Sequence, residues 1–289
     1  MNILVLGGNG YLGSKVIRAL MEENQHTITC TVRSMSSQDR IISCIEKGLV
    51  VIPASLDAVR KAMNCVSFDT VFNMVCSYGK INTLYNNVIE ANIEYPLYVM
   101  DCLVEMGCKR FLTIGTGLPD DLNMYSFSKK MFSEFGNFYV RHHGVDFLNM
   151  KLQMFYGDDE PRERFIPQMI QKMLLGQNVD VTLGTQRRDI VAVSDVVRAI
   201  MVVFHSKLHG YQEISVGTGI APRISELVDY IWTETGMRSC VRKGAIPMRE
   251  NEPDCIADTT KLNELMDWEP IYWKQGIRQM ICNMKGLEL

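Results

Sequence analysis

The 289-residue chain lacks the features that mark several classes of protein. No apolar run approaches the ~20 residues that a membrane helix needs. A net charge of −3 leaves no excess of basic residues for binding nucleic acid. The nine cysteines are scattered without Cys-x-x-Cys spacing, which favours reduced thiols over a disulfide framework. The first residues carry no basic leader and are expected to form a strand rather than a signal peptide, so we predict a cytoplasmic protein.

The chain also lacks a recognisable metal site or nucleophilic triad. His205 and His209 have the i, i+4 spacing of zinc ligands, but no acidic third ligand is evident nearby. His142 and His143 are expected at the end of a helix, where cationic residues are favoured. No Ser/His/Asp or Cys/His arrangement stands out, and we therefore predict no metal.

What the sequence does contain is a regular alternation of short apolar runs and helical patterns. The longest helical patterns lie at about 84–106 and 125–141. Such β-α-β alternation predicts a parallel sheet with helices on both faces. The second half is less regular. The strands expected in the first half are 3–6, 27–32, 49–52, 70–75, 111–114 and 147–152.

A glycine-rich loop follows the first expected strand. In it Gly7, Gly10 and Gly13 are spaced three apart. The first glycine allows a tight turn, the second lets the backbone approach a pyrophosphate, and the third lets helix and strand pack closely. The helix that begins near Tyr11 and Leu12 would offer N–H groups to the phosphates. An ordinary strand-to-helix turn has the same pattern, but a place at the start of an alternating chain favours a dinucleotide site.

The strand at 27–32 is followed by Arg33 and Ser34. A site for NAD usually has an acidic residue here, which binds the ribose 2′-hydroxyl. Arg33 stands about 20 residues past the last glycine, where a cation can hold a 2′-phosphate. The alternative is a solvated loop charge. We predict NADPH as the cofactor.

Three further residues could move a proton while a nicotinamide moves a hydride. Thr116 lies two residues beyond the expected strand 111–114. Tyr125 begins a helix nine residues after Thr116. Lys129 lies one helical turn beyond Tyr125, where its charge would favour the phenolate and could also hold the nicotinamide ribose. Thr116 would donate a hydrogen bond to the same substrate oxygen. The set predicts a carbonyl/alcohol oxidoreductase.

Together these motifs resemble the extended short-chain dehydrogenase/reductase (NAD-dependent epimerase/dehydratase) family, which acts on nucleotide sugars. The resemblance spans nearly the whole chain. It implies a Rossmann-type doubly wound parallel sheet at 1–153 and about 194–217, with a smaller C-terminal α/β substrate-binding domain at about 154–193 and 218–289. Further matching segments are 71–76, Asn92, 155–157, 188–196, 258–261 and 268–270.

Within the family the chain most resembles the nucleotide-diphospho-4-keto-6-deoxyhexose C4-reductases, such as CDP-abequose and CDP-paratose synthases. The short connection from Thr116 to Tyr125 and the Arg-Glu-Asn-Glu segment at 249–252 carry this resemblance. Gly117 and Leu118 stand where a 4,6-dehydratase has Asp-Glu, which argues against dehydration. Ser55 and Met154 depart from the family pattern at an adenine contact and a substrate contact.

The resemblance also implies substrate contacts and an assembly. Arg188 and Arg249 match arginines that bind the substrate diphosphate. The alternative for each is a surface ion pair, for Arg188 with Asp189. In relatives the helices at 84–106 and 125–141 pair into a four-helix bundle, which predicts a homodimer. Apolar residues beyond one face of these helices include Tyr95, Tyr98, Met131 and Phe135.

The expected activity is NADPH-dependent reduction of the C4 carbonyl of a nucleotide-diphospho-4-keto-6-deoxy sugar, in the synthesis of deoxysugar and surface-polysaccharide precursors. Two alternatives stay open. One is an NDP-sugar 4-epimerase. Such an enzyme needs a tightly held, recycled NAD, and Arg33 disfavours NAD. The other is a non-catalytic dinucleotide-binding regulator, which would not need the Thr/Tyr/Lys set. The nucleotide, the sugar and the C4 stereochemistry of the product are not encoded in these motifs.

Overall fold

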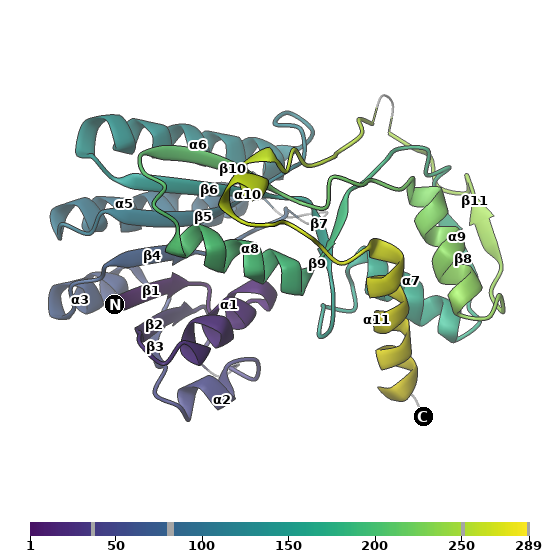
Figure 1. The fold of residues 1–289 in the computed structure, drawn as a ribbon, viewed down its shortest axis with the longest axis horizontal. Coiled ribbons are helices and arrows are strands. Elements are labelled where there is room, and N and C mark those ends of the chain that lie inside the picture. Colours follow the sequence, from purple (N-terminus) through teal and green to yellow (C-terminus); the bar gives the residue numbers. More distant parts are fainter. Residues whose placement is uncertain (36–37, 80–83, 250–251, 288–289) are drawn as a thin grey trace. The chain divides into compact units, whose positions relative to one another are not determined.

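The computed structural model describes residues 1–35, 38–79, 84–249 and 252–287 (Figure 1). It divides into two compact units. The first comprises Met1–Lys151 and Val197–Ile214, and the second comprises Leu152–Val196 and Ser215–Leu289. Across the described residues, no helix combines the length and the apolar character that crossing a membrane requires.

The first unit is built on a seven-stranded sheet in the order β10-β6-β5-β4-β1-β2-β3. The strand pairs β1–β2, β2–β3, β1–β4 and β4–β5 are parallel. The order reverses between β1 and β4, and at such a switch point ligands bind beyond the carboxyl ends of the strands. The predicted Rossmann-type fold is confirmed. The strands are β1 (Asn2–Leu6), β2 (Thr27–Val32), β3 (Val50–Pro53), β4 (Thr70–Asn73), β5 (Arg110–Thr116), β6 (Asp146–Leu152) and β10 (Tyr211–Val216).

Helices pack on both faces of this sheet because the strands are apolar on both sides. On one face, α3 (Leu56–Cys65), α5 (Tyr95–Glu105) and α6 (Met124–His143) bury Val59, Leu103 and Phe132 against Val71 and Phe111. On the other face, the ring of Phe72 lies 5.2 Å from Phe204 of α8 (Val193–His205). The alternation of Val71 and Phe72 between the faces follows from the two-residue period of a strand.

The expected helix at 84–106 is not uniform. It consists of α4 (Tyr85–Ile89), one π-helical turn η1 (Glu90–Glu94) and α5. A π-helical turn holds one residue more than an α-helical turn and often marks a functional site. Here the turn contains Asn92, whose side chain is buried and takes part in three hydrogen bonds.

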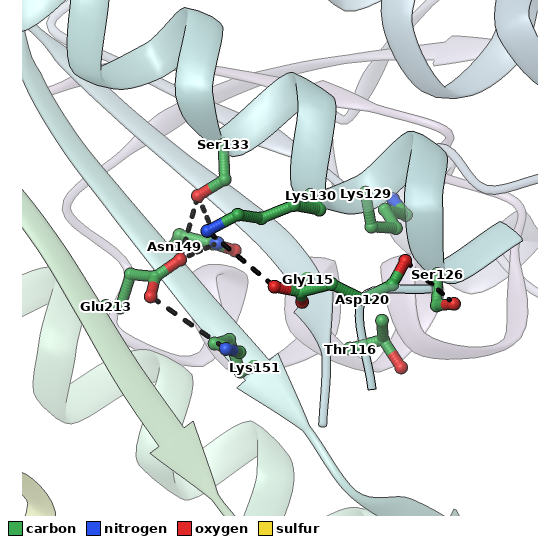
Figure 2. Close-up of a pocket in the computed structure, with 10 residues that line it drawn as sticks. All are labelled: Gly115, Thr116, Asp120, Ser126, Lys129, Lys130, Ser133, Asn149, Lys151 and Glu213. Carbon is green, nitrogen blue, oxygen red and sulfur yellow. Dashed lines mark hydrogen bonds and ion pairs between the residues drawn. The ribbon is translucent and has the colours of Figure 1, made fainter. Parts of the chain in front are cut away.

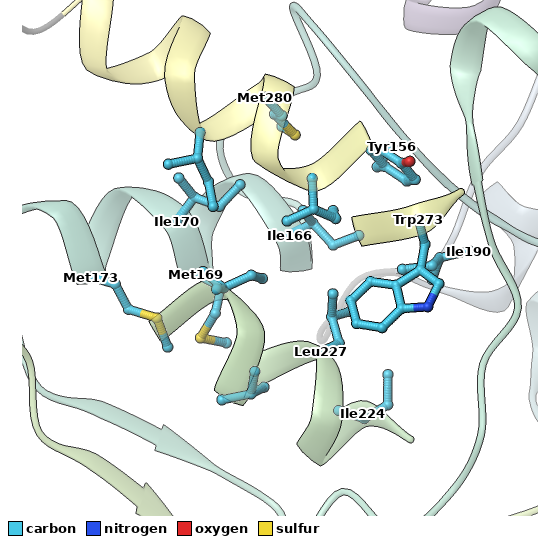
Figure 3. Close-up of a cluster of buried hydrophobic side chains, with 14 of the residues drawn as sticks. Tyr156, Ile166, Met169, Ile170, Met173, Ile190, Ile224, Leu227, Trp273 and Met280 are labelled. Carbon is cyan, nitrogen blue, oxygen red and sulfur yellow. The ribbon is translucent and has the colours of Figure 1, made fainter. Parts of the chain in front are cut away.

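The second unit has its own hydrophobic core, which Figure 3 shows between three helices. These are α7 (Phe165–Leu174), α9 (Ile224–Glu234) and α11 (Trp273–Leu287). Two small parallel sheets flank them, β7 (Met154–Tyr156) with β9 (Ile190–Ala192) and β8 (Val179–Val181) with β11 (Val241–Lys243). Two short helices remain, α2 (Ile42–Ile45) in the first unit and α10 (Thr260–Leu265) in the second. In the first unit, the longer helix α1 (Tyr11–Glu22) follows the glycine loop.

Packing in the second core is tightest where α11 crosses Tyr156. A Cβ atom added at Gly276 would lie 1.9 Å from the Tyr156 hydroxyl oxygen, whereas one added at Gly286 of the same helix would meet nothing within 4 Å.

We expect Gly276→Ala to lower the free energy of unfolding by about 1–3 kcal/mol through overpacking. The control Gly286→Ala, near the exposed end of the same helix, should change it by less than about 0.5 kcal/mol. Urea denaturation measures both, and a Gly276→Ala variant as stable as wild type would contradict the packing described.

Candidate active site

The glycine loop joins β1 to α1 and is closely packed. Gly7 has a φ of 78°, a conformation that favours glycine, and Gly10 caps α1 in an extended conformation. A Cβ atom at Gly13 would lie 2.4 Å from the Gly7 carbonyl oxygen. One at Gly8 would lie 2.6 Å from Cys30 Cβ of β2, a constraint that the three-residue spacing did not reveal.

This loop fits a dinucleotide pyrophosphate. The N–H groups of the first turn of α1 have no acceptor within the helix, and the positive end of the helix dipole lies there. The absence of a side chain at Gly10 leaves the backbone open to close approach, while Gly7 and Gly13 shape the turn and its packing. The Gly7 N–H donates to Thr31 Oγ1 at 3.1 Å, which ties the loop to β2.

The residues expected at the adenosine end of the cofactor lie just beyond β2. Both Arg33 and Ser34 are exposed at the carboxyl end of this strand, which neighbours β1 in the sheet. Ser55, where the chain departs from the family pattern, caps α3 by accepting a hydrogen bond from the Ala58 N–H at 3.3 Å. The position therefore has a structural role in starting a helix.

The structure brings Thr116 and Tyr125 together. Thr116 is the last residue of β5, and a capping box between Asn123 and Ser126 starts α6 so that Tyr125 lies in its first turn. The Thr116 side chain lies close enough to the Tyr125 hydroxyl to lower its pKa. Thr116 Oγ1 also accepts from the Leu118 N–H at 3.2 Å, which leaves its proton for Tyr125.

Lys129 lies one turn along α6 from Tyr125. Its side chain is buried, and the ammonium donates to the Val75 carbonyl at 3.2 Å. Burial lowers the pKa of Lys129, while the nearby Cys76 thiol opposes this shift. The ammonium is therefore held by the backbone beyond β4 as well as by its own helix.

The pKa of Tyr125 is governed mainly by burial. Burial raises the pKa of the Tyr125 phenol well above its ordinary value, the charges of Cys76 and Tyr78 raise it further, and Thr116 acts in the opposite direction. The effect of Lys129 on this phenol stays a prediction.

Sequence reasoning missed the segment that surrounds Tyr125 and Lys129, which comprises residues 75–78 after β4. The ring of Tyr78 packs on Tyr125 with centroids 4.9 Å apart, and Cys76 raises the pKa of the Tyr125 hydroxyl. Residues beyond a strand on its carboxyl side are the signal that could have found them, since ligands bind at that edge.

Asn92 fixes this segment to α6. Its Nδ2 donates to Ser128 Oγ and to the Ser77 carbonyl, both at 2.9 Å, and its Oδ1 accepts from the Ser77 N–H at 2.8 Å. The sequence indicated Asn92 only as a family motif. The structure shows that it links the π-helical turn, the 75–78 segment and the helix that carries Tyr125.

A small pocket in the first unit lies under the end of β5 (Figure 2). Its charged groups are paired, since Glu213 accepts from Ser133 at 2.9 Å and lies 3.9 Å from Lys151, whereas the buried Asn149 Oδ1 has no hydrogen-bond partner among the described residues. A Cβ atom at Gly115 would lie 2.4 Å from Asn149 Oδ1. The pocket therefore supports the strand end that carries Thr116, and its paired charges do not suit an anionic ligand.

The two substrate arginines have different surroundings in the second unit. Arg188 is buried and donates to the Glu252 carboxylate and the Pro253 carbonyl. The alternative ion pair with Asp189 is not formed, because Asp189 accepts hydrogen bonds from the backbone N–H groups of residues 218, 219 and 257. Arg249 is exposed, and residues 250–251 of its motif lie outside the described part of the chain.

Three of the five histidines, His26, His205 and His209, pair with carboxylates in the first unit. Glu23 accepts from Nε2 of His26 at 2.6 Å and of His205 at 2.7 Å, and His209 lies 3.1 Å from Asp146. Within the described ranges, no group of three or more His, Cys, Asp or Glu residues is arranged to hold a metal ion.

Known proteins of similar sequence act on nucleotide sugars. The chain is 25% identical to CDP-abequose synthase of Salmonella typhimurium strain LT2, a match that covers 96% of this chain and 97% of the relative. It is 23% identical to UDP-glucose 4-epimerase of Lactobacillus helveticus, over 93% of this chain and 92% of the relative.

Solved structures share the fold. The UDP-glucose 4-epimerase of Thermotoga maritima with UDP-glucose superposes with a TM-score of 0.87 at 20% identity, over 100% of both chains. The UDP-glucose 4-epimerase of Thermus thermophilus with NAD gives a TM-score of 0.84 at 18% identity, over 99% of both chains.

The sequence model of one family matches most of the chain. That model describes the NAD dependent epimerase/dehydratase family, and it matches residues 3–217. The matched residues include the glycine loop and all three of Thr116, Tyr125 and Lys129. The chain therefore belongs to the NAD-dependent epimerase/dehydratase family and is an NAD(P)-dependent enzyme of the short-chain dehydrogenase/reductase type.

Proposed function

We propose that the protein reduces the C4 carbonyl of a nucleotide-diphospho-4-keto-6-deoxy sugar, with NADPH as the hydride source. Similarity to CDP-abequose synthase over nearly the full length of both chains supports the substrate class. The observation that carries the choice of a reductase is Arg33, which is exposed at the carboxyl end of β2, where an NAD site usually has an acidic residue. A cation there suits the 2′-phosphate of NADPH, the hydride donor for a net reduction.

The proposed chemistry divides between Thr116 and Tyr125. Both hydroxyls would donate hydrogen bonds to the C4 oxygen, and Tyr125 would transfer its proton as negative charge develops there. A raised pKa does not prevent this transfer, since an alkoxide is far more basic than a phenolate. The bound nicotinamide supplies the hydride.

The residues of the glycine loop and of the 75–78 segment would hold the cofactor. Gly7, Gly10 and Gly13 leave room for the pyrophosphate, and Arg33 would bind the 2′-phosphate. Lys129 would bind the nicotinamide ribose. Its ammonium has three donors, of which the Val75 carbonyl takes one, so two can serve the ribose hydroxyls.

The substrate diphosphate would meet the two arginines unequally. Arg249 is exposed and can approach the phosphates without breaking a contact inside the second unit. Arg188 is already neutralised by Glu252, so a diphosphate would have to displace that carboxylate. We therefore assign the larger part of diphosphate binding to Arg249 and a smaller one to Arg188.

A 4-epimerase is the second candidate, and the similarity to UDP-glucose 4-epimerase of Lactobacillus helveticus favours it. An epimerase needs a tightly held, recycled NAD, which Arg33 at the carboxyl end of β2 disfavours. Stoichiometric oxidation of NADPH by a panel of 4-keto sugar nucleotides supports the reductase, whereas interconversion of C4 epimers without net cofactor turnover supports the epimerase.

Removing the phenol oxygen tests the acid. Tyr125→Phe keeps the ring and should lower the rate of NADPH oxidation by roughly 10²–10⁴, the usual contribution of a positioned general acid. NADPH binding, followed by fluorescence, should change little. The control is Tyr139→Phe, which removes a second tyrosine hydroxyl from α6. That hydroxyl donates to Asp101 of α5, away from the proposed site, so its loss should leave the rate unchanged. Near-normal turnover of Tyr125→Phe would show that another group donates the proton.

Reversing the charge beyond β2 tests the cofactor. Arg33→Asp should weaken NADPH binding more than NADH binding, because only NADPH carries the 2′-phosphate. Dissociation constants for both cofactors measure this difference. The control Lys47→Asp makes the same charge change at an exposed position and should affect both cofactors equally and weakly. An equal loss for both with Arg33→Asp would contradict the assignment.

We also propose a homodimer formed through α5 and α6. Phe135 and Phe138 of α6 are 43% and 46% exposed, while the Tyr95 hydroxyl contacts Thr31 and the Tyr98 ring is covered by Arg60. The apolar contact surface therefore lies mainly on α6.

Light scattering should show a dimer at micromolar concentration. Phe138→Asp should dissociate it, because a carboxylate would be buried in the interface. The control Ile42→Asp, at a more exposed apolar position on α2, should leave it dimeric. A monomeric wild-type protein would refute the assembly.

A further inference from the structure

The carboxamide of Asn149 lies beneath the end of the strand that carries Thr116. Asn149 belongs to β6, which lies between β5 and β10 in the sheet, and its side chain is buried. Its Nδ2 donates to Ser133 Oγ of α6 at 2.7 Å and to Glu213 Oε1 of β10 at 3.1 Å (Figure 2). A helix and a neighbouring strand therefore hold this carboxamide in place.

The orientation of the carboxamide is fixed by these two bonds. A carboxylate only accepts hydrogen bonds, so Glu213 must face the Nδ2 side of the amide, and both N–H groups of Asn149 are used. Ser133 donates to the same Glu213 oxygen at 2.9 Å, which ties the two partners to each other. The Asn149 Oδ1 atom must then face the other way. It is buried and has no hydrogen-bond partner in the described part of the chain.

The Oδ1 side of Asn149 is in contact with the backbone of Gly115. A Cβ atom at Gly115 would lie 2.4 Å from Oδ1 and 3.2 Å from both Cγ and Nδ2, and these are the three atoms nearest to it. So close an approach is possible only because position 115 has no side chain. The next residue is Thr116, the last of β5, so any displacement at this contact moves Thr116 as well.

We propose that Asn149 is a positioning residue for Thr116: its carboxamide, anchored to α6 and β10, fixes the end of β5 and so places the Thr116 hydroxyl for the substrate oxygen. The inference rests on the proposed function, since it takes Thr116 to donate a hydrogen bond to the C4 oxygen. The helix that anchors Asn149 through Ser133 also carries Tyr125, so one network sets both hydroxyls. A buried amide oxygen without a partner costs stability, a cost that an apolar side chain at position 149 would avoid.

The test combines a substitution that adds an atom with one that removes atoms. Gly115→Ala adds a methyl group that collides with the carboxamide, and Asn149→Ala removes the carboxamide. In the double variant the added methyl group occupies part of the space that the carboxamide leaves. Thr116→Val removes the hydroxyl itself. The control Val59→Ala shortens a buried side chain of α3 and reports the effect of a loss of stability alone.

We expect each single substitution, Gly115→Ala or Asn149→Ala, to lower kcat for carbonyl reduction by roughly 10–100-fold, because a displacement of about 1 Å at a reacting group has an effect of this size. KM and the NADPH dissociation constant should change little. The double variant should recover most of the loss, whereas independent defects would multiply. In a Thr116→Val background neither substitution should lower kcat further, since the hydroxyl that it displaces is absent. Val59→Ala should keep the wild-type kcat.

The Leu118 amide gives a second readout that needs neither substrate nor turnover. Its N–H donates to Thr116 Oγ1 at 3.2 Å, so its signal in a ¹H–¹⁵N NMR spectrum reports where that hydroxyl lies. Thr116→Val supplies the reference signal for the lost hydrogen bond. Each single substitution should shift the Leu118 signal toward this reference, and the double variant should return it toward the wild-type position.

Two results would overturn the inference. One is a wild-type kcat and a wild-type Leu118 signal in Asn149→Ala. The other is a double variant that recovers neither kcat nor the Leu118 signal relative to Asn149→Ala. Both comparisons remain decisive if Gly115→Ala alone does not fold.

Failure of the proposed function gives a different result. If no 4-keto sugar nucleotide is reduced while the Leu118 signal responds as expected, the reductase proposal fails and the positioning role of Asn149 stands. If reduction proceeds and neither kcat nor the signal changes, the reductase stands and Asn149 has no positioning role.

Discussion

The carboxamide of Asn92 connects three parts of the first unit that carry the proposed chemistry. It lies in a π-helical turn, bonds both backbone groups of Ser77 and donates to Ser128 of α6. All of its donors and one of its acceptor positions are used, and the side chain is buried. Loss of such a group leaves several polar partners unsatisfied in a low-dielectric interior, which is costly. The geometry of Tyr125, Lys129 and Cys76 depends on this one side chain.

In the second unit a buried carboxylate has a comparable organising role. Asp189 accepts hydrogen bonds from Thr218, Gly219 and Ala257, which joins β9 to two later segments of chain. A carboxylate can be buried at this position because backbone N–H groups compensate its charge. The neighbouring Arg188 is left to pair with Glu252 instead. The two consecutive ionic residues therefore have different partners. Asp189 binds backbone N–H groups and holds the chain together, whereas Arg188 binds the loop that carries Arg249.

Features that depend on neighbouring residues could be predicted from the sequence. The alternation of apolar runs predicted the parallel sheet, and the motif set predicted the family, both of which are confirmed. The glycine spacing is local, and the positive φ of Gly7 and the contact of Gly13 with Gly7 give it a physical reason. Roles assigned to individual site residues stay predictions, although the structure does bring Thr116 and Tyr125 together.

Features that depend on distant residues could not be predicted. The π-helical turn at Asn92 has no pattern of its own, because it differs from an α-helix only in the partner of each N–H group. The partner of Arg188 is set by where the chain returns at Glu252, and the sequence suggested the adjacent Asp189 instead. The pKa of Tyr125 depends on burial and on Cys76, neither of which follows from the position of Lys129 one turn away.

The contact between Gly8 and Cys30 has a consequence for chemical durability. Burial, with the neighbouring Cys44, raises the pKa of Cys30 to about 12. Oxidants and alkylating agents react with thiolates and not with thiols. The sulfur packed beneath the glycine loop therefore stays inert while exposed cysteines such as Cys65, Cys240 and Cys282 can be modified. Oxidative damage to the surface thiols would leave the floor of the dinucleotide loop intact.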